Sequence, residues 1–477
     1  MATAFDKHDP PAKTRAIFAL GLLALTISIS LAGCTLTKRQ AQITLPEDLP
    51  QTWATRVCVD DLPIASNLLG LIDLPELKAL VHEAMNNNPD LRATALRLKA
   101  EGFLLGRPRS QMLPKVEAGI SRGRNNQGNN DNTGRTEPQT YHKISANVSW
   151  EIDMWGRLAN EYSAAKQEVT AKEKDFLQAR DALAARTIQA WINQLADRRA
   201  KGIEEERLAV LQHIEAVLIQ RYRDGLGSLD EYSTARSRTQ IARADLSTRQ
   251  ANLDRSVRAL EILLGRYPGG QLSSGKEWPT LPMPIVDMPA AALSLRPDIQ
   301  AGLARVEAAR NLARAADKAR LPLLSLSGEI FRTGTRISDI GSATTYWGVL
   351  GSLFQPLFQG GRLRDEARAK HSEAMAAIED LHAIVLRSLS EVENALTLEK
   401  ELAVQIVALG SAVEESEKSS RYYVYRYRQG LDSIQSLLIA REQEMTVKMR
   451  LNQLKADRLG NRIDLALAVG AGIGDNP

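Results

Sequence analysis

The chain of 477 residues is poor in the residue types that carry most catalytic and ligand-binding chemistry. It has six histidines, two cysteines and 5% aromatic residues, and its formal net charge is +4. The histidines show no metal-ligand spacing, and no glycine-rich phosphate loop follows a strand. The carboxylates Glu391 and Glu393 fall on different sides of a predicted helix and are expected to be solvated. We therefore expect no enzyme activity, no metal, no non-covalent cofactor and, from the near-balanced charge, no nucleic-acid partner.

The first 33 residues have the composition of an export signal. Lys7, Lys13 and Arg15 precede an apolar run from Ala16 to Leu31. That run is marginal for a membrane-spanning helix and stops at small residues, as a cleaved signal peptide does. An uncleaved anchor helix is the alternative.

The end of this signal, Leu31-Ala32-Gly33-Cys34, resembles the bacterial lipobox. The resemblance implies that Cys34 carries a covalent lipid and becomes the first residue of the mature protein. Thr35 stands where an aspartate would signal retention in the inner membrane, so the resemblance points to the outer membrane. Cys58 then remains without a cysteine partner for an internal disulfide.

Several motifs occur twice at a constant distance along the chain. Asn88-Pro89-Asp90-Leu91 recurs as Arg296-Pro297-Asp298-Ile299, which is 208 positions later (297 − 89). Further on, Tyr222-Arg223-Asp224-Gly225-Leu226 recurs as Tyr427-Arg428-Gln429-Gly430-Leu431, at a distance of 205 (427 − 222). Two constant distances separated by one small change are typical of a duplicated unit with a loop of variable length.

Proline placement predicts the domain organisation. No proline lies between Pro138 and Pro268 or between Pro356 and Pro477, so very long helices are permitted there. Prolines gather instead between the two halves. We predict a signal peptide at 1–33, a lipid-anchored arm at 34–75, a first repeat at 76–266, a proline-rich linker at 267–290, a second repeat at 291–470 and a tail at 471–477.

Apolar residues recur with helical spacing inside the proline-free stretches. Each stretch has one break, at Asp224-Gly225 and at Gln429-Gly430, where glycine can end a helix. Each half is therefore predicted to contain a long helical hairpin, with its tip near Gly225 or Gly430. A helix from Arg157 to Tyr222 would be about 100 Å long at 1.5 Å per residue.

Ahead of each helical hairpin the pattern changes to the alternation of β-strands. We predict one β-hairpin at about 115–151 and a second at about 323–357, both bordered by aromatic residues. Such strands fit a transmembrane barrel or a soluble hairpin with one face on a core. Four strands cannot close a barrel, and lipid does not tolerate an open sheet edge, so a barrel requires several copies in a ring.

Taken together, these features resemble the outer membrane efflux factors, the TolC and OprM family, and specifically its lipid-anchored branch. The resemblance rests on the lipobox, the doubled Pro-Asp and Leu-Pro motifs, the doubled Gly-Arg-Leu motif at 156–158 and 361–363, and the doubled Tyr-Arg-x-Gly-Leu motif. It implies a mainly α-helical, internally duplicated chain with a transmembrane β portion. Three chains would form an α-barrel in the periplasm and a twelve-stranded β-barrel in the outer membrane of a Gram-negative bacterium, with four strands from each chain.

The same resemblance implies a passive exit duct for small molecules in a tripartite efflux pump. Its partners would be a periplasmic adaptor protein and an inner-membrane RND-type transporter. Two alternatives remain open. An adaptor lipoprotein would carry one helical hairpin and several small β-rich modules, and a lipid-anchored coiled-coil scaffold would leave the doubled β-hairpins unexplained.

The resemblance also assigns roles to residues at the hairpin tips. The candidates for adaptor docking are Gly225, Leu226, Ser228, Gly430, Leu431 and Ser433. Simple helix capping by glycine and serine is the alternative. Glu231 and Tyr427 match a carboxylate–tyrosine pair that closes the tip in the family. Asp230 and Asp432 are further aperture candidates, although both are also typical of solvated helix starts.

Overall fold

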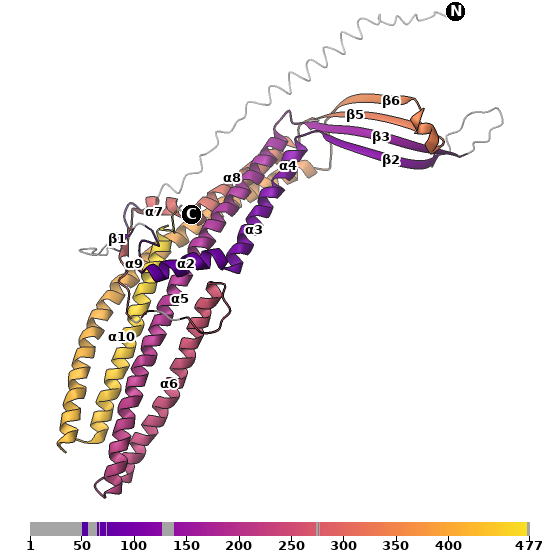
Figure 1. Cartoon of the computed structure of the whole chain (residues 1–477). Coiled ribbons are helices and arrows are strands. Elements are labelled where there is room, and N and C mark those ends of the chain that lie inside the picture. Colours follow the sequence, from indigo (N-terminus) through magenta and orange to yellow (C-terminus); the bar gives the residue numbers. More distant parts are fainter. Residues whose placement is uncertain are drawn as a thin grey trace, which may run out of the picture. The chain divides into compact units, whose positions relative to one another are not determined.

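The computed structural model describes residues 50–55, 64–65, 67–72, 74–125, 138–272, 275 and 277–474 (Figure 1). The predicted signal peptide at 1–33 and both cysteines, Cys34 and Cys58, lie outside the described residues. So do residues 126–137 of the predicted strand-connecting loop and the last three residues of the predicted tail.

Two successive runs of elements have the same order. The first copy consists of α2 (Pro75–Asn87), α3 (Pro89–Leu104), α4 (Gly106–Gln111), β2 (Lys115–Asn125), β3 (Gln139–Ile152), α5 (Arg157–Arg223) and α6 (Leu229–Leu263). The second copy consists of α7 (Pro289–Leu295), α8 (Pro297–Lys318), β5 (Leu323–Gly334), the 3-10 helix η2 (Ile337–Gly341), β6 (Thr345–Phe354), α9 (Arg362–Arg428) and α10 (Ile434–Ala468).

The long helices of the two copies have equal lengths. Helices α5 and α9 each contain 67 residues, and α6 and α10 each contain 35. None of the four contains a proline, so no backbone hydrogen bond is lost along them. Gly156 and Gly361, both with positive φ, precede α5 and α9 and allow the chain to turn from strand to helix.

The helices of each copy pack against those of the other (Figure 1). Helices α5 and α6 form one hairpin and α9 and α10 form the second, while α10 also packs against α5. Helix α8 lies between α5 and α9. The largest apolar core forms where α2, α5, α6 and α10 meet, and it includes Trp191, Leu195, Leu260 and Ile463.

The strands form one antiparallel sheet in the order β2-β3-β5-β6. Strands β3 and β5 join the two copies, with Trp150 opposite Leu326. Strands β2 and β6 are the two edges of the sheet. Strand β6 ends at Phe354, before the predicted end of the second hairpin at 357; Pro356, which has no N–H for a further ladder bond, follows shortly after.

The predicted linker has structure of its own. Its strand β4 (Met283–Pro284) pairs in parallel with β1 (Ile64–Ala65) from the N-terminal arm. The buried carboxylate of Glu261, near the end of α6, accepts hydrogen bonds from the backbone N–H groups of Gly270, Gln271 and Leu272. Burial acts to raise the pKa of Glu261, but these three donors outweigh it and hold the pKa below its usual value.

A search of the described helices for a membrane-crossing segment, long and apolar throughout, found none.

Candidate functional site

Both hairpin tips are built around the predicted glycines. Gly225 has a φ of 73°, and Gly430 has a φ of 70°, so each occupies the left-handed region that favours glycine. At the first tip the Leu226 N–H donates to the Arg221 carbonyl at 2.8 Å, and the Gly225 N–H donates to the Tyr222 carbonyl at 3.1 Å. This pair of bonds is a Schellman motif, which satisfies the last carbonyl groups of the helix.

The second tip repeats this geometry. The Leu431 N–H donates to the Arg426 carbonyl at 2.9 Å, and the Gly430 N–H donates to the Tyr427 carbonyl at 3.0 Å. The side chains of Leu226 and Leu431 are 71% and 61% exposed. Each tip therefore presents one leucine to solvent on a rigid turn, without a covering contact in this chain.

The predicted serines cap the helices that leave the tips. The Ser228 hydroxyl accepts a hydrogen bond from the Glu231 N–H at 3.1 Å, and the Glu231 carboxylate accepts from the Ser228 N–H at 3.4 Å. These two bonds form a capping box at the start of α6. At the start of α10 the Ser433 hydroxyl accepts from the Ser436 N–H at 3.3 Å.

The aperture candidates differ in their surroundings. Asp432 accepts a hydrogen bond from the Ser433 N–H at 2.9 Å and pairs with the Arg426 guanidinium at 3.2 Å. Hydrogen bonds from the side chain of Ser436 and the backbone of Ser433, together with the Arg426 charge, lower the pKa of Asp432. Asp230 lies exposed in the first turn of α6.

The structure does not join Glu231 to Tyr427. The Glu231 carboxylate is engaged in the capping box of its own helix. The Tyr427 hydroxyl is buried and has no hydrogen-bond partner among the described residues, and its ring lies 6.0 Å from the Arg221 guanidinium of the other hairpin. Tyr427 packs against an apolar cluster that includes Leu218, Ile434 and Leu438 and joins the ends of both hairpins.

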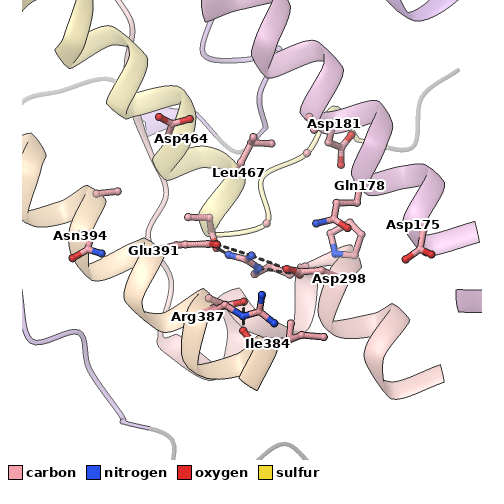
Figure 2. Close-up of a pocket in the computed structure, with 18 of the residues that line it drawn as sticks. Asp175, Gln178, Asp181, Asp298, Ile384, Arg387, Glu391, Asn394, Asp464 and Leu467 are labelled. Carbon is pink, nitrogen blue, oxygen red and sulfur yellow. Dashed lines mark hydrogen bonds and ion pairs between the residues drawn. The ribbon is translucent and has the colours of Figure 1, made fainter. Parts of the chain in front are cut away.

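A second polar region, which the sequence reasoning missed, lies where α10 ends against the start of α8. A cavity of about 770 Å³ opens there between α5, α8, α9 and α10. Figure 2 shows Asp175, Gln178 and Asp181 on the α5 side of this cavity and Arg387 and Glu391 on the α9 side. The signal was present in the Arg-Pro-Asp motif at 296–298, which was interpreted only as the start of a helix.

Arg296 is the centre of this region. Its guanidinium pairs with Asp298 at 2.7 Å and Glu391 at 2.8 Å, and it donates to the Ala468 carbonyl at 2.9 Å. Burial acts to lower the pKa of Arg296, but the bonds and charges of the two carboxylates outweigh it and raise the pKa. The prediction that Glu391 and Glu393 are merely solvated was wrong, because Glu393 also accepts hydrogen bonds, from the backbone of residues 54 and 55.

Within the described residues no group of three or more histidine, cysteine or acidic side chains could hold a metal ion. Burial raises the pKa of Asp464 in the cavity wall, against a hydrogen bond that Gln189 donates to it at 2.6 Å. The cavity is thus a mixed-charge region of the wall between helices.

A family model described as outer membrane efflux protein matches residues 80–266 and 288–471. The chain belongs to this family. The two matched segments coincide with the two copies, so the family is matched over both halves of the duplicated chain.

Individual relatives agree along almost the whole length. The outer membrane protein OprJ of Pseudomonas aeruginosa is 26% identical to the channel over 95% of this chain and 96% of the relative. The cation efflux system protein CusC of Escherichia coli is 25% identical over 94% and 99%. Among solved structures, the Campylobacter jejuni CmeC channel covers 91% of this chain with a TM-score of 0.81 and 21% identity, and 95% of that chain is covered.

A second solved structure, the open state of the Neisseria gonorrhoeae MtrE outer membrane channel, has a TM-score of 0.80 at 21% identity, and covers 91% of this chain and 98% of its own. The resemblance to the outer membrane efflux factors is therefore confirmed. The chain is an efflux channel of the outer membrane of a Gram-negative bacterium, and its family consists of transport ducts rather than enzymes.

Proposed function

We propose that three copies of this chain assemble into one passive exit duct for small molecules. Four strands from each chain would close a twelve-stranded β-barrel in the outer membrane, and the long helices would form the wall of an α-barrel in the periplasm. A ring of identical chains with one repeated interface is the usual form of a soluble or membrane homo-oligomer.

The observation that carries this proposal is the pair of unpaired sheet edges. Strands β2 and β6 each have a neighbour on one side only. Large apolar side chains on both are exposed, among them Ile120 at 77%, Trp347 at 76% and Val349 at 69%. Apolar side chains fit lipid, but lipid offers no partner to an open edge, so β6 of one chain needs β2 of another.

The proposed lipid anchor is Cys34, acylated on its thiol and on the new amino terminus. A relative that is 23% identical over 96% of this chain, SilC of Salmonella typhimurium, carries the name probable outer membrane lipoprotein. Acyl chains at the start of the arm would hold each subunit at the membrane surface in addition to its strands, and two or more chains make such attachment stable.

At the opposite end, we propose that the tips dock a periplasmic adaptor, which links the duct to an inner-membrane RND-type transporter. The exposed Leu226 and Leu431 on two rigid turns supply apolar contacts. Gly225 and Gly430 add no side chain, so a partner helix can approach their backbone closely. Ser228 and Ser433 keep the adjoining helix starts in shape for that contact.

The aperture is assigned to the same end. Asp230, Glu231, Tyr427 and Asp432 are proposed to lie at the narrowest part of the duct. The free Tyr427 hydroxyl is available for a closing hydrogen bond, and Glu231 can supply a carboxylate oxygen while its other oxygen stays in the capping box. Closure would then be a bond between the two hairpins, formed or broken as the tips move.

The cargo is proposed to be chosen elsewhere in the pump. Three relatives are named for pyoverdine export, toluene efflux and cation efflux, which are chemically unlike cargoes. All three share 24% identity or more with this chain over at least 83% of its length. A wide, wet duct that accepts what the transporter delivers accounts for one fold serving all of them.

The test uses the full-length lipoprotein extracted from outer membranes. Its mass in detergent is measured by native mass spectrometry, and its conductance is recorded after insertion into a planar lipid bilayer. We expect a trimer with discrete conductance steps, which disappear when the sample is first dissociated by heat. A monomer that leaves the bilayer sealed would disprove the duct.

A further inference from the structure

The two copies meet along a narrow contact between α8 and α5. Arg305 of α8 pairs with both carboxylate oxygens of Asp175 of α5, at 2.5 and 2.7 Å. One turn away, Ala301 and Ala304 of α8 pack against the buried Ala171 of α5. We call Ala171, Asp175, Ala301 and Arg305 the inter-copy seam. Small side chains let the two helices approach closely, and the ion pair fixes their register.

The internal duplication places the same four residue types on two other helices. Helix α3 corresponds to α8 at a distance of 208, which takes Ala301 to Ala93 and Arg305 to Arg97. Helix α9 corresponds to α5 at a distance of 205. That distance takes Ala171 to Ala376 and Asp175 to Asp380. All four residue types are retained, including both charges of the ion pair.

Within one chain these four residues are not used in this way. Helix α3 packs against α5, not α9, and neither Arg97 nor Asp380 forms an ion pair among the described residues. Arg97, Asp380 and Ala376 are all exposed. Leu96, which corresponds to the buried Ala304, is 67% exposed, and the neighbouring Met375 is 60% exposed. The chain therefore carries both halves of a second seam on separate surfaces.

We propose that this second seam forms between neighbouring subunits, with α3 of one chain packed against α9 of the next. Ala93 would contact the partner subunit's Ala376, and Arg97 would pair with the partner subunit's Asp380. A ring built from a duplicated chain alternates contacts within and between chains, and the duplication makes the two kinds equivalent. The inference rests on the proposed trimer, because α9 of the same chain already packs against α8 on its other side.

The same correspondence sets the pairing of the sheet edges. Inside the chain β3 pairs with β5, with Val148 opposite Gly328. Moving β3 forward by 205 and β5 back by 208 places Leu353 of β6 opposite the partner's Ile120 on β2. Both are exposed in one chain, at 67% and 77%. The helical seam and the strand register are thus two ends of one interface.

Cysteine cross-linking tests the seam in native outer membranes. The variant Ala93→Cys/Ala376→Cys is made in a full-length Cys58→Ser chain, so that the introduced pair provides the reactive thiols. Mild oxidation is expected to give covalent dimers and trimers on denaturing gels. The control is Ala93→Cys/Ala383→Cys, because Ala383 is also exposed on α9 but lies two helical turns away, about 10 Å. The control is expected to stay monomeric on the gel.

Charge reversal tests the ion pair. Arg97→Asp or Asp380→Arg places like charges across every subunit interface, so each variant is expected to lower the temperature at which the trimer dissociates in detergent. The double variant Arg97→Asp/Asp380→Arg restores opposite charges and is expected to recover most of that loss. The matched control Glu379→Arg reverses the neighbouring charge on α9 and should have little effect on dissociation.

The outcomes separate this inference from the proposed duct. A conducting trimer with no cross-link at 93 and 376, and no recovery in the double variant, overturns the seam and leaves the duct intact. A monomeric, non-conducting protein overturns both. Cross-linked trimers together with recovery by the double variant establish the seam.

Discussion

The two copies of the unit share their backbone geometry but differ in how they satisfy the same buried positions. Where α6 ends, the Asn88 amide donates to the Leu263 carbonyl at 3.0 Å. At the equivalent point of the second copy, the Arg296 guanidinium donates to the Ala468 carbonyl at 2.9 Å. A neutral side chain and a paired charge thus perform one structural task. The duplicated backbone requires a donor at this position and does not dictate its charge.

The clearest difference lies in the core of α5 and α9. In the first copy the buried Gln194 donates to the Leu272 carbonyl at 2.8 Å. Its counterpart in the second copy, the buried Glu399, pairs with Arg462 at 2.8 Å and Arg458 at 2.9 Å. The second copy therefore depends on complete charge pairing, whereas the first depends on one neutral hydrogen bond.

Removing Glu399 should have the largest effect. Glu399→Ala leaves Arg462 buried without its carboxylate, and we expect a loss of about 3–5 kcal/mol in unfolding free energy. Gln194→Ala should cost only about 1–3 kcal/mol. Urea unfolding of the purified protein in detergent measures both, and Glu399→Gln, which installs the residue of the first copy, is the isosteric control. Equal losses in the two alanine variants would mean that the ion cluster is not more demanding than the amide.

The next effect concerns a contact that only the first copy has. Glu261 corresponds to Ala466 in the second copy, so its hold on the linker has no counterpart. Glu261→Gln should cost about 2 kcal/mol, because charge-assisted acceptors become neutral. The folded-state pKa of Glu261 is lowered, so its contribution is present above the usual carboxyl value of 4.5 and is lost as pH falls through the lower folded value.

Unfolding midpoints at neutral pH and at pH below 4.5 check this sign. The wild type should lose stability toward acid, and Glu261→Gln should lose less, so the two curves approach each other. Curves that stay parallel would show that Glu261 does not titrate with folding.

A smaller effect distinguishes the helix caps at the two tips. Ser228→Ala should destabilise the start of α6 by about 1 kcal/mol. Ser433→Ala should cost less, because the adjacent Asp432 remains as a hydrogen-bond acceptor and accepts from the residue-433 N–H. Hydrogen exchange of the first-turn amides of α6 and α10 gives the two values. Faster exchange in α10 than in α6 would reverse the ranking.

The smallest effect on stability is expected for Tyr427→Phe, because the buried hydroxyl has no partner to lose. If this hydroxyl closes the aperture, the variant should nevertheless raise the basal conductance of the duct in planar bilayers. Tyr222→Phe is the control, since Tyr222 occupies the equivalent position of the first copy and stacks on Tyr232. Equal conductance in wild type and Tyr427→Phe would remove Tyr427 from the closing mechanism.

Local and periodic features of the structure could be predicted from the sequence. Proline-free stretches indicated α5 and α9, alternation indicated the four strands, and Gly225 and Gly430 were placed at the tips, where both adopt positive φ. Each of these depends on neighbours within a few residues of the chain. The duplication added the rest, because motifs repeated at two distances imply the same elements twice.

Contacts between distant elements could not be predicted in this way. Arg296 meets Glu391 only because α9 folds back beside α8, and Glu399 meets Arg462 across more than 60 positions. No periodicity encodes which face of a long helix will lie against which charge. The equivalence of the two seams also required the observed Arg305–Asp175 pair, since Arg97 and Asp380 taken alone are two ordinary surface charges.

The matched helix lengths have a consequence for how such a conduit can evolve. Adding one residue to α5 alone would advance its end by about 1.5 Å and rotate it by about 100°, which would misalign the first turn against the second. A deeper or shallower cell envelope can therefore be accommodated only by concerted insertions in both 67-residue helices, with compensating growth of their shorter mates. The protein is a ruler whose gradations must change in step.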